Sequence, residues 1–82
     1  MEPMVNDAMP EPPAAQLSRG LSAERAGRYT DAADAYLEAT RLAPWDIDAQ
    51  VRLGLVLRVL GRDEEANEAF RLALHIRAEH DE

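Results

Sequence analysis

The 82-residue chain makes one small domain, in a size range where a single core is marginal unless packing or association supports it. It contains no cysteine, which excludes a disulfide framework and a thiolate metal site. A formal charge of −7 with interspersed signs argues against a nucleic-acid binder, which needs a basic face. All nine basic residues are arginine, a bias that indicates a GC-rich bacterial genome rather than nine guanidinium sites.

The N-terminal stretch MEPMVNDAMPEPPAA carries acids and prolines where a secretory signal needs a basic end and an apolar run. No later segment is long enough and uncharged enough to cross a bilayer, so we expect a cytoplasmic protein that does not enter membranes. Residues 1–13 hold four of the five prolines and no aromatic residue, which predicts a flexible tail. A leader that keeps the protein soluble is favoured over a short linear motif in this tail.

A first helix is predicted from Ala14 to about Ala26, with Leu17 and Leu21 on one face. Gly20, on the same helix, lets a neighbouring backbone come close. Gly27 follows the periodic segment and fits the left-handed residue that closes helices.

The second helix is predicted to run from Thr30 or Asp31 to Ala43, with Thr30 as its cap. It ends before Pro44, because the residue that precedes a proline is pushed out of the helical region. Trp45 lies in the turn that follows, and we expect its ring to pack across the junction between the two halves of the chain.

Asp46 is predicted to cap a third helix, Ile47 to Leu60, whose run VRLGLVLRVL is apolar nearly all round. Such a helix should be central and covered on most sides by the second and fourth helices. Gly61 closes it, Asp63 caps the fourth helix, and the final RAEHDE frays into solvent. Four helices of 12 to 15 residues joined by short turns predict an all-α fold of two stacked antiparallel hairpins.

The two hairpins repeat each other at a spacing of 34 residues. This shift aligns nine identical residues, more than the roughly three that the composition gives by chance, and a fixed period is the signature of repeat architectures. The identical pairs are Ala15/Ala49, Gln16/Gln50, Gly20/Gly54, Leu21/Leu55, Gly27/Gly61, Arg28/Arg62, Ala32/Ala66, Ala35/Ala69 and Ala39/Ala73.

This pattern resembles the tetratricopeptide repeat family, whose 34-residue unit is a helix-turn-helix. The family's small, glycine, small, aromatic, small and proline positions match Gly20/Gly54, Gly27/Gly61, Ala32/Ala66, Tyr36/Phe70, Ala39/Ala73 and Pro44. The resemblance implies a short right-handed α-solenoid over residues 14–80, with repeat 1 at about 13–46 and repeat 2 at about 47–80.

Three departures from the family pattern indicate end repeats. Asp63 stands where the first copy has the turn aromatic Tyr29, Ala78 replaces the closing proline, and Arg19 occupies the position of Leu53. Two units are few for a solenoid, because the interfaces between neighbouring units supply much of its stability. We therefore expect modest stability, self-association or a partner.

By resemblance, the protein is a non-catalytic scaffold that holds a peptide or an amphipathic helix in a groove lined by the first helix of each unit. The family's groove positions map onto Leu17, Leu21, Glu24, Arg25, Asp48, Val51, Arg52, Leu55, Arg58 and Val59. The groove has none of the lysines and asparagines with which family members clamp a terminal carboxylate, so that activity is not expected.

Three arginines at the edge of this groove favour a partner with acidic flanks. An equally weighted interpretation is that the groove's leucines and valines only pack helix on helix. The second function considered is a self-assembling subunit whose third helix is buried against its twin. An enzyme's accessory subunit is a remote third.

Catalytic constellations are missing from the sequence: we find no nucleophile beside a base, no phosphate-binding glycine loop and no convergent carboxylates. We therefore expect neither an enzyme nor a cofactor. His75 and His80 are five residues apart, off the spacing that places two ligands on one helix face, although His75 and Glu79 are four apart. A metal site needs three or four ligands, so a solvated helix end is the favoured interpretation.

Overall fold

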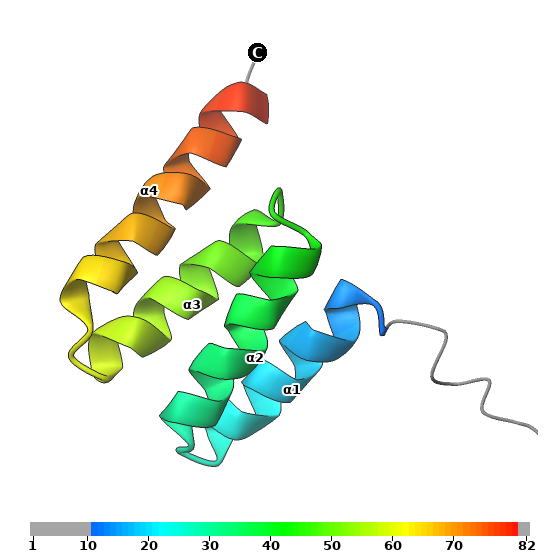
Figure 1. Cartoon of the computed structure of the whole chain (residues 1–82), viewed down its shortest axis with the longest axis vertical. Helices are drawn as coiled ribbons and strands as arrows, with labels where there is room; N and C mark the ends of the chain where they lie inside the picture. Colours follow the sequence, from blue (N-terminus) through cyan, green and yellow to red (C-terminus); the bar gives the residue numbers. More distant parts are fainter. Residues whose placement is uncertain (1–10, 81–82) are drawn as a thin grey trace, which may run out of the picture.

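The computed structural model describes residues 11–80, in which four helices and no strand occur. The helices are α1 (Pro13–Arg25), α2 (Tyr29–Leu42), α3 (Ile47–Val59) and α4 (Asp63–His80), shown in Figure 1. The all-α prediction is confirmed. Most of the predicted tail, residues 1–10, lies outside the described residues.

Gly27 and Gly61 close the first helix of each hairpin, as predicted. Their φ angles are 78° and 79°, in the left-handed region that other residues rarely adopt. After Gly27, the backbone N–H of Arg28 bonds to the carbonyl of Ala23 at 2.8 Å, and Arg62 bonds to Leu57 at the same distance. Both helices therefore end in the same six-to-one hydrogen bond, which satisfies a carbonyl that would lack a partner.

The start of α3 agrees with the prediction, because Asp46 Oδ1 accepts a hydrogen bond from the backbone N–H of Ala49 at 3.3 Å. The predicted Thr30 cap is wrong. The helix α2 begins earlier, at Tyr29, because the Arg28 carbonyl already accepts the hydrogen bond of the Ala32 N–H at 2.9 Å. The Arg28 side chain has no acceptor and so provides no cap.

The outer ends of the domain also differ from the prediction. The first helix starts at Pro13, one residue early, since a proline loses nothing at a first helical position. The fourth helix has 18 residues and stays helical through His80, where fraying was expected. Its sequence offers no proline or glycine to stop it. Asp63 lies inside its first turn with two further acids, where all three favour the positive helix end.

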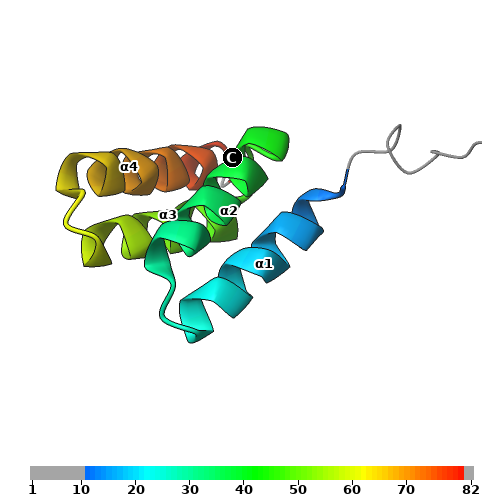
Figure 2. The ribbon, with the colours of Figure 1, turned by 60° about the horizontal axis from the view of Figure 1, so that its bottom comes forward.

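Packing follows chain order. Two hairpins form, α1 with α2 and α3 with α4, and they meet through α2 and α3. Figure 1 shows the four helices side by side in this order, and Figure 2 shows α2 between α1 and α3. The third helix is thus central, as predicted. The core consists of Ala23, Ala32, Ala33, Tyr36, Leu53, Val56, Leu57, Ala66 and Ala69.

A glycine and an aromatic ring interlock within each hairpin. A Cβ added to Gly20 would lie 2.3 Å from the Tyr36 ring, and one added to Gly54 would lie 2.5 Å from the Phe70 ring. The expectation of a close backbone at Gly20 is therefore corrected: an aromatic side chain fills the notch. The repeated notch explains why both copies keep a glycine in mid-helix despite its cost of up to about 1 kcal/mol relative to alanine.

Trp45 does not pack across the junction, so this prediction is wrong. Its side chain is 63% exposed at the tip of the turn that the Asp46 N–H closes onto the Ala43 carbonyl at 3.0 Å. Small residues are buried on both sides of Trp45 instead, Ala43 before it and Ala49 in the first turn of α3. No helix within residues 11–80 combines the length and the apolar character that a membrane span requires.

Candidate partner-binding groove

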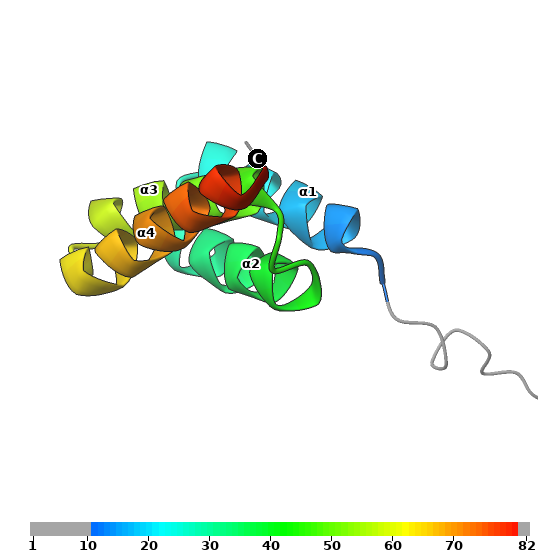
Figure 3. The same ribbon diagram turned by 90° about the horizontal axis from the view of Figure 1, so that it is seen from above.

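The predicted groove residues lie on α1 and α3, which run along the same side of α2 (Figure 3). Four of them, Leu21, Glu24, Arg25 and Arg52, line one hollow of about 370 Å³. Tyr29 completes its wall. The structure therefore brings together residues that are up to 31 positions apart in the chain.

Tyr36 fixes the acidic side of this hollow from beneath. Its ring is fully buried, and its hydroxyl donates a hydrogen bond to Glu24 Oε1 at 2.7 Å. Burial, reinforced by the hydrogen bond and the charge of Glu24, raises the pKa of Tyr36 to about 12, while Arg52 opposes the shift. The phenol therefore stays a neutral donor at physiological pH and holds the carboxylate in place.

The groove analysis from sequence overlooked both tyrosines. The sequence pattern gives Tyr29 as the turn aromatic and Tyr36 as the aromatic position of the repeat, and it predicts neither as a groove residue. A comparison of the two repeats could have identified Tyr36, because the equivalent residue Phe70 has no hydroxyl. A buried tyrosine hydroxyl requires a polar partner, and the first helix offers Glu24.

The three groove arginines have different surroundings. Arg52 donates to Asp48 Oδ2 at 3.2 Å, and this hydrogen bond raises the pKa of Arg52. The guanidinium of Arg58 stands 5.1 Å from the centre of the Phe70 ring, within the range of a cation–π contact. Arg25 is exposed and makes no ion pair within residues 11–80.

The apolar groove residues divide into two groups. Leu17, Leu21 and Val51 are half-buried, and Leu17 packs against the core. Leu55 and Val59 are 48% and 62% exposed, so they do not serve helix packing within the described part of the chain. The half-buried residues therefore contribute to helix packing, whereas the two exposed residues are available to a partner.

This exposure corrects the expectation that the third helix would be covered on most sides. Leu53, Val56 and Leu57 are buried where α2 and α4 pack against α3. The remaining side carries Leu55 and Val59, which we call the α3 stripe. The stripe and Arg58 lie one to two turns beyond Arg52 along α3, outside the hollow itself.

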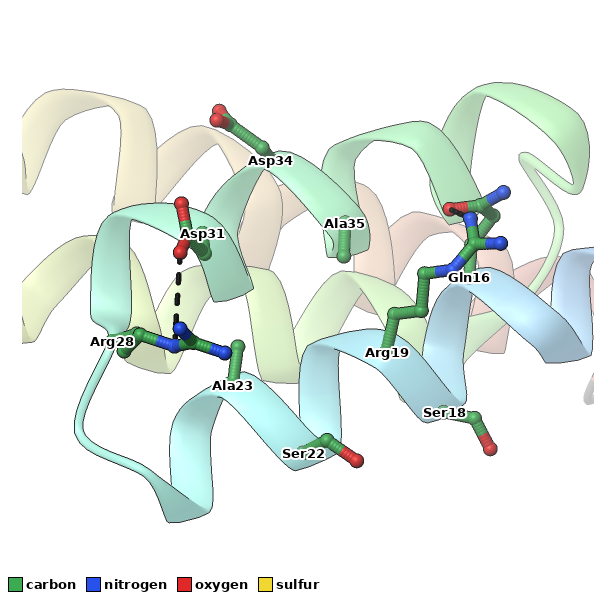
Figure 4. A pocket seen from close by; sticks show the side chains of 9 residues that line it. All are labelled: Gln16, Ser18, Arg19, Ser22, Ala23, Arg28, Asp31, Asp34 and Ala35. Atoms are coloured by element: carbon green, nitrogen blue, oxygen red, sulfur yellow. Dashed lines mark hydrogen bonds and ion pairs between the residues drawn. The ribbon is translucent and has the colours of Figure 1, made fainter.

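A larger hollow of about 600 Å³ lies between α1 and α2 (Figure 4). Seven of its nine lining residues are polar or charged. Arg28 and Asp31 lie 3.8 Å apart there, and Figure 4 draws this ion pair as a dashed line. The residues lining it are Gln16, Ser18, Arg19, Ser22, Ala23, Arg28, Asp31, Asp34 and Ala35.

The same place in repeat 2 is partly filled by Leu37 and Thr40 of the preceding α2. The larger hollow is therefore the face on which a preceding repeat would pack. Here it carries Arg19 and Ser22 in place of the buried Leu53 and Val56, which suits a face in water and fits the end-repeat interpretation.

The described residues contain no group of three or more metal-ligating side chains. His75 Nε2 lies 3.4 Å from Glu79 Oε2, which makes one exposed pair on the fourth helix.

Comparison with protein families gives two overlapping matches to one family model, described as Tetratricopeptide repeat, at residues 5–47 and 17–81. The longer match covers most of the chain and includes all four described helices except the first four residues of α1. A comparison with curated proteins finds no match.

Proposed function

Because the chain belongs to the tetratricopeptide repeat family, whose repeats generally mediate protein–protein interactions, we propose that it is a non-catalytic scaffold with a peptide-binding groove. The groove is lined by α1 and α3 and takes a peptide or an amphipathic helix of a partner protein. The observation that carries this proposal is the exposed α3 stripe beside a hollow in which Glu24 and Arg52 are already held by hydrogen bonds.

The α3 stripe supplies the apolar part of the interaction. Leu55 and Val59 are four residues apart, so their side chains lie one above the other on the same helix face. An apolar side chain of the partner that covers one of them gains about 1 kcal/mol or more, from roughly 25 cal/mol per Å² of apolar area removed from water. Two or three such contacts suit a short amphipathic segment.

The charged residues determine which flanks the partner carries. The groove has three arginines against Glu24 and Asp48, so its local charge is opposite in sign to that of the whole chain. Arg52 is already engaged by Asp48, whereas Arg25 makes no ion pair within residues 11–80. A carboxylate of the partner placed near Arg25 completes the pairing. We therefore expect an apolar segment with an acidic flank.

Preorganisation supports binding by a groove this small. The hydrogen bond from Tyr36 to Glu24 and the pair between Arg52 and Asp48 fix two charged side chains before a ligand arrives. Each long side chain that is already ordered saves roughly 0.5–1.5 kcal/mol of entropy on binding.

The proposal is tested with a displayed library of random 16-residue peptides, selected on the purified 82-residue chain. We expect selected peptides to combine apolar residues at helical spacing with aspartate or glutamate. Leu55→Asp should weaken their binding about tenfold or more, because it places a charge in the stripe. The Arg25→Glu variant should remove the preference for acidic flanks.

Leu74→Asp is the matched control, since Leu74 is also an exposed helical leucine, 64% exposed, but lies on α4. Circular dichroism checks that both variants stay helical. Equal loss of peptide binding in the two variants, or no loss in Leu55→Asp, would contradict the groove assignment. Self-assembly through α3, the alternative from the sequence, would use the same stripe. Sedimentation of the chain and of Leu55→Asp over a range of concentrations, described below, distinguishes it from peptide binding.

A further inference from the structure

The helices α2 and α4 occupy equivalent places in the two repeats but differ in what covers them. On α2, the residues toward repeat 2 include Tyr36, Thr40 and Ala43, all buried. The equivalent residues of α4 are Phe70, Leu74 and Arg77, of which Phe70 is only half-buried and the other two are exposed. With Asn67, the counterpart of the buried Ala33, they form a surface that we call the α4 face.

This face is shaped to receive a helix. In the first repeat, the equivalent surface holds α3, whose Leu53 and Val56 join Tyr36 and Ala33 in one core cluster. At its centre the α4 face is more apolar than its counterpart, since Leu74 is 64% exposed where the buried Thr40 stands in repeat 1. Within residues 11–80, Arg58 of α3 stands over part of the Phe70 ring at 5.1 Å, whereas Leu74 and Arg77 stay exposed.

We propose that the α4 face binds the α4 face of a second copy of this chain, with the two helices antiparallel about a two-fold axis. The charge distribution along α4 favours this partner. Its first turn carries Asp63, Glu64 and Glu65, and its last turn carries Arg77 on the α4 face. Glu79, in the same last turn, lies on the opposite side of the helix, 3.4 Å from His75. Antiparallel pairing therefore sets the acidic start of each helix against Arg77 of the other, and the two helix dipoles also oppose.

The register follows from the apolar residues. An axis midway between Phe70 and Leu74 places each of these two side chains opposite the other in the second copy. The same register puts Asn67 opposite Arg77, with Glu64 one turn farther on within reach of the guanidinium. Arg71, the charged residue nearest the axis, is paired with Glu68 at 2.9 Å, which reduces repulsion between the two copies.

A head-to-tail arrangement is disfavoured by the first repeat. Its outer face has Arg19 and Ser22 where α3 uses Leu53 and Val56 to pack against the preceding helix. Covering Arg19 would strip water from a charge that is already paired with Glu11 at 2.5 Å. The two-fold arrangement avoids this cost and closes on itself, as most homo-oligomers do.

The size of the contact predicts its strength. A helix of 18 residues is about 27 Å long at 1.5 Å per residue, and one face of it buries less than a standard interface of about 1,600 Å² in total. We therefore expect a weak dimer, dissociating in the micromolar range. The inference does not depend on the groove proposal, because it uses a different helix.

Sedimentation of the 82-residue chain from about 5 to 500 μM, a range around a micromolar Kd, tests the dimer. The expected result is a reversible shift from monomer to dimer. Leu74→Asp should raise the Kd about tenfold or more, whereas Leu55→Asp should leave it unchanged. Arg77→Glu should weaken the dimer too, and mixing it with the Glu64→Arg variant should restore association as a mixed dimer.

Cysteine crosslinking tests the register, and the chain has no cysteine of its own to interfere. A mixture of Asn67→Cys and Arg77→Cys proteins should form disulfide-linked pairs faster than either variant alone. A monomer at every concentration overturns the proposal. Dissociation by Leu55→Asp with no effect of Leu74→Asp also overturns it, since self-association would then use α3.

Discussion

Tyr36 and Phe70 occupy the same position of the repeat and press against the same kind of glycine notch, yet their surroundings differ. Tyr36 is fully buried, with the second repeat beyond it, while Phe70 is half-buried and has Arg58 over its ring. The position of each ring in the stack of helices therefore determines how much the ring contributes to the unfolding free energy. The first ring links two repeats and the second faces an unfilled surface.

The largest expected effect comes from removing the two rings in turn. Tyr36→Ala should cost about 3–5 kcal/mol of unfolding free energy, because it empties a fully buried site. Phe70→Ala should cost clearly less, since water already reaches that ring. Chemical denaturation measures both. Equal costs would contradict the comparison.

Tyr36 carries a hydroxyl that can lose a proton and Phe70 does not, so only the Tyr36 ring should make the unfolding free energy depend on pH. Its pKa is about 12 in the folded chain and about 10 when unfolded, so the folded state retains the proton longer. This contribution is fully present below pH 10 and is lost as pH rises toward 12. The unfolding free energy should fall by roughly 2 kcal/mol over that interval, because one unit of pKa difference corresponds to about 1.4 kcal/mol.

Tyr36→Phe is the control for this pH effect. It keeps the ring in the notch and makes the site resemble repeat 2, and it should remove most of the fall between pH 10 and 12. A Tyr36→Phe variant with the same alkaline loss as the parent would show that other groups cause it.

The glycine notches are expected to differ by a smaller amount. Gly20→Ala should cost about 1–3 kcal/mol through overpacking, less the gain of up to about 1 kcal/mol in helix propensity. Gly54→Ala should cost less, because the half-buried Phe70 ring has room to move outward, whereas the Tyr36 ring is enclosed. Thermal unfolding of the two variants compares them directly, and a costlier Gly54→Ala would reverse the argument.

The smallest effect is predicted at Trp45. Its exposed ring lies in the turn that joins the repeats, so Trp45→Ala should change the unfolding free energy by no more than about 0.5 kcal/mol. A loss well above 1 kcal/mol in denaturation would mean that the ring does bridge the repeats.

Most of the fold could be predicted from sequence because its determinants are local or periodic. Gly27 and Gly61 mark helix ends by their backbone freedom, and the 34-residue period relates the hairpins without any knowledge of contacts. The errors arose where tertiary contacts decide. Trp45 is exposed, and the α3 stripe is open, because burial depends on which faces of a neighbouring helix are available.

The candidate site could be predicted only as a set of positions. The resemblance to the repeat family placed Leu21 and Arg52 on the groove side, and both residues line one hollow in the structure. The hydrogen bond from Tyr36 to Glu24 joins two residues that are 12 positions apart and lie on different helices. Periodicity along one helix does not reveal such a contact. Cytoplasmic location and bacterial origin stay predictions from composition.

The central claim is that a partner binds on the α1 and α3 side. The most direct measurement is a nuclear magnetic resonance titration of the labelled 82-residue chain with a selected acidic amphipathic peptide. The account predicts that shifts concentrate at Leu21, Arg25, Leu55 and Val59. Shifts confined to α2 and α4, around Leu37 and Leu72, with the groove residues unchanged, would contradict it.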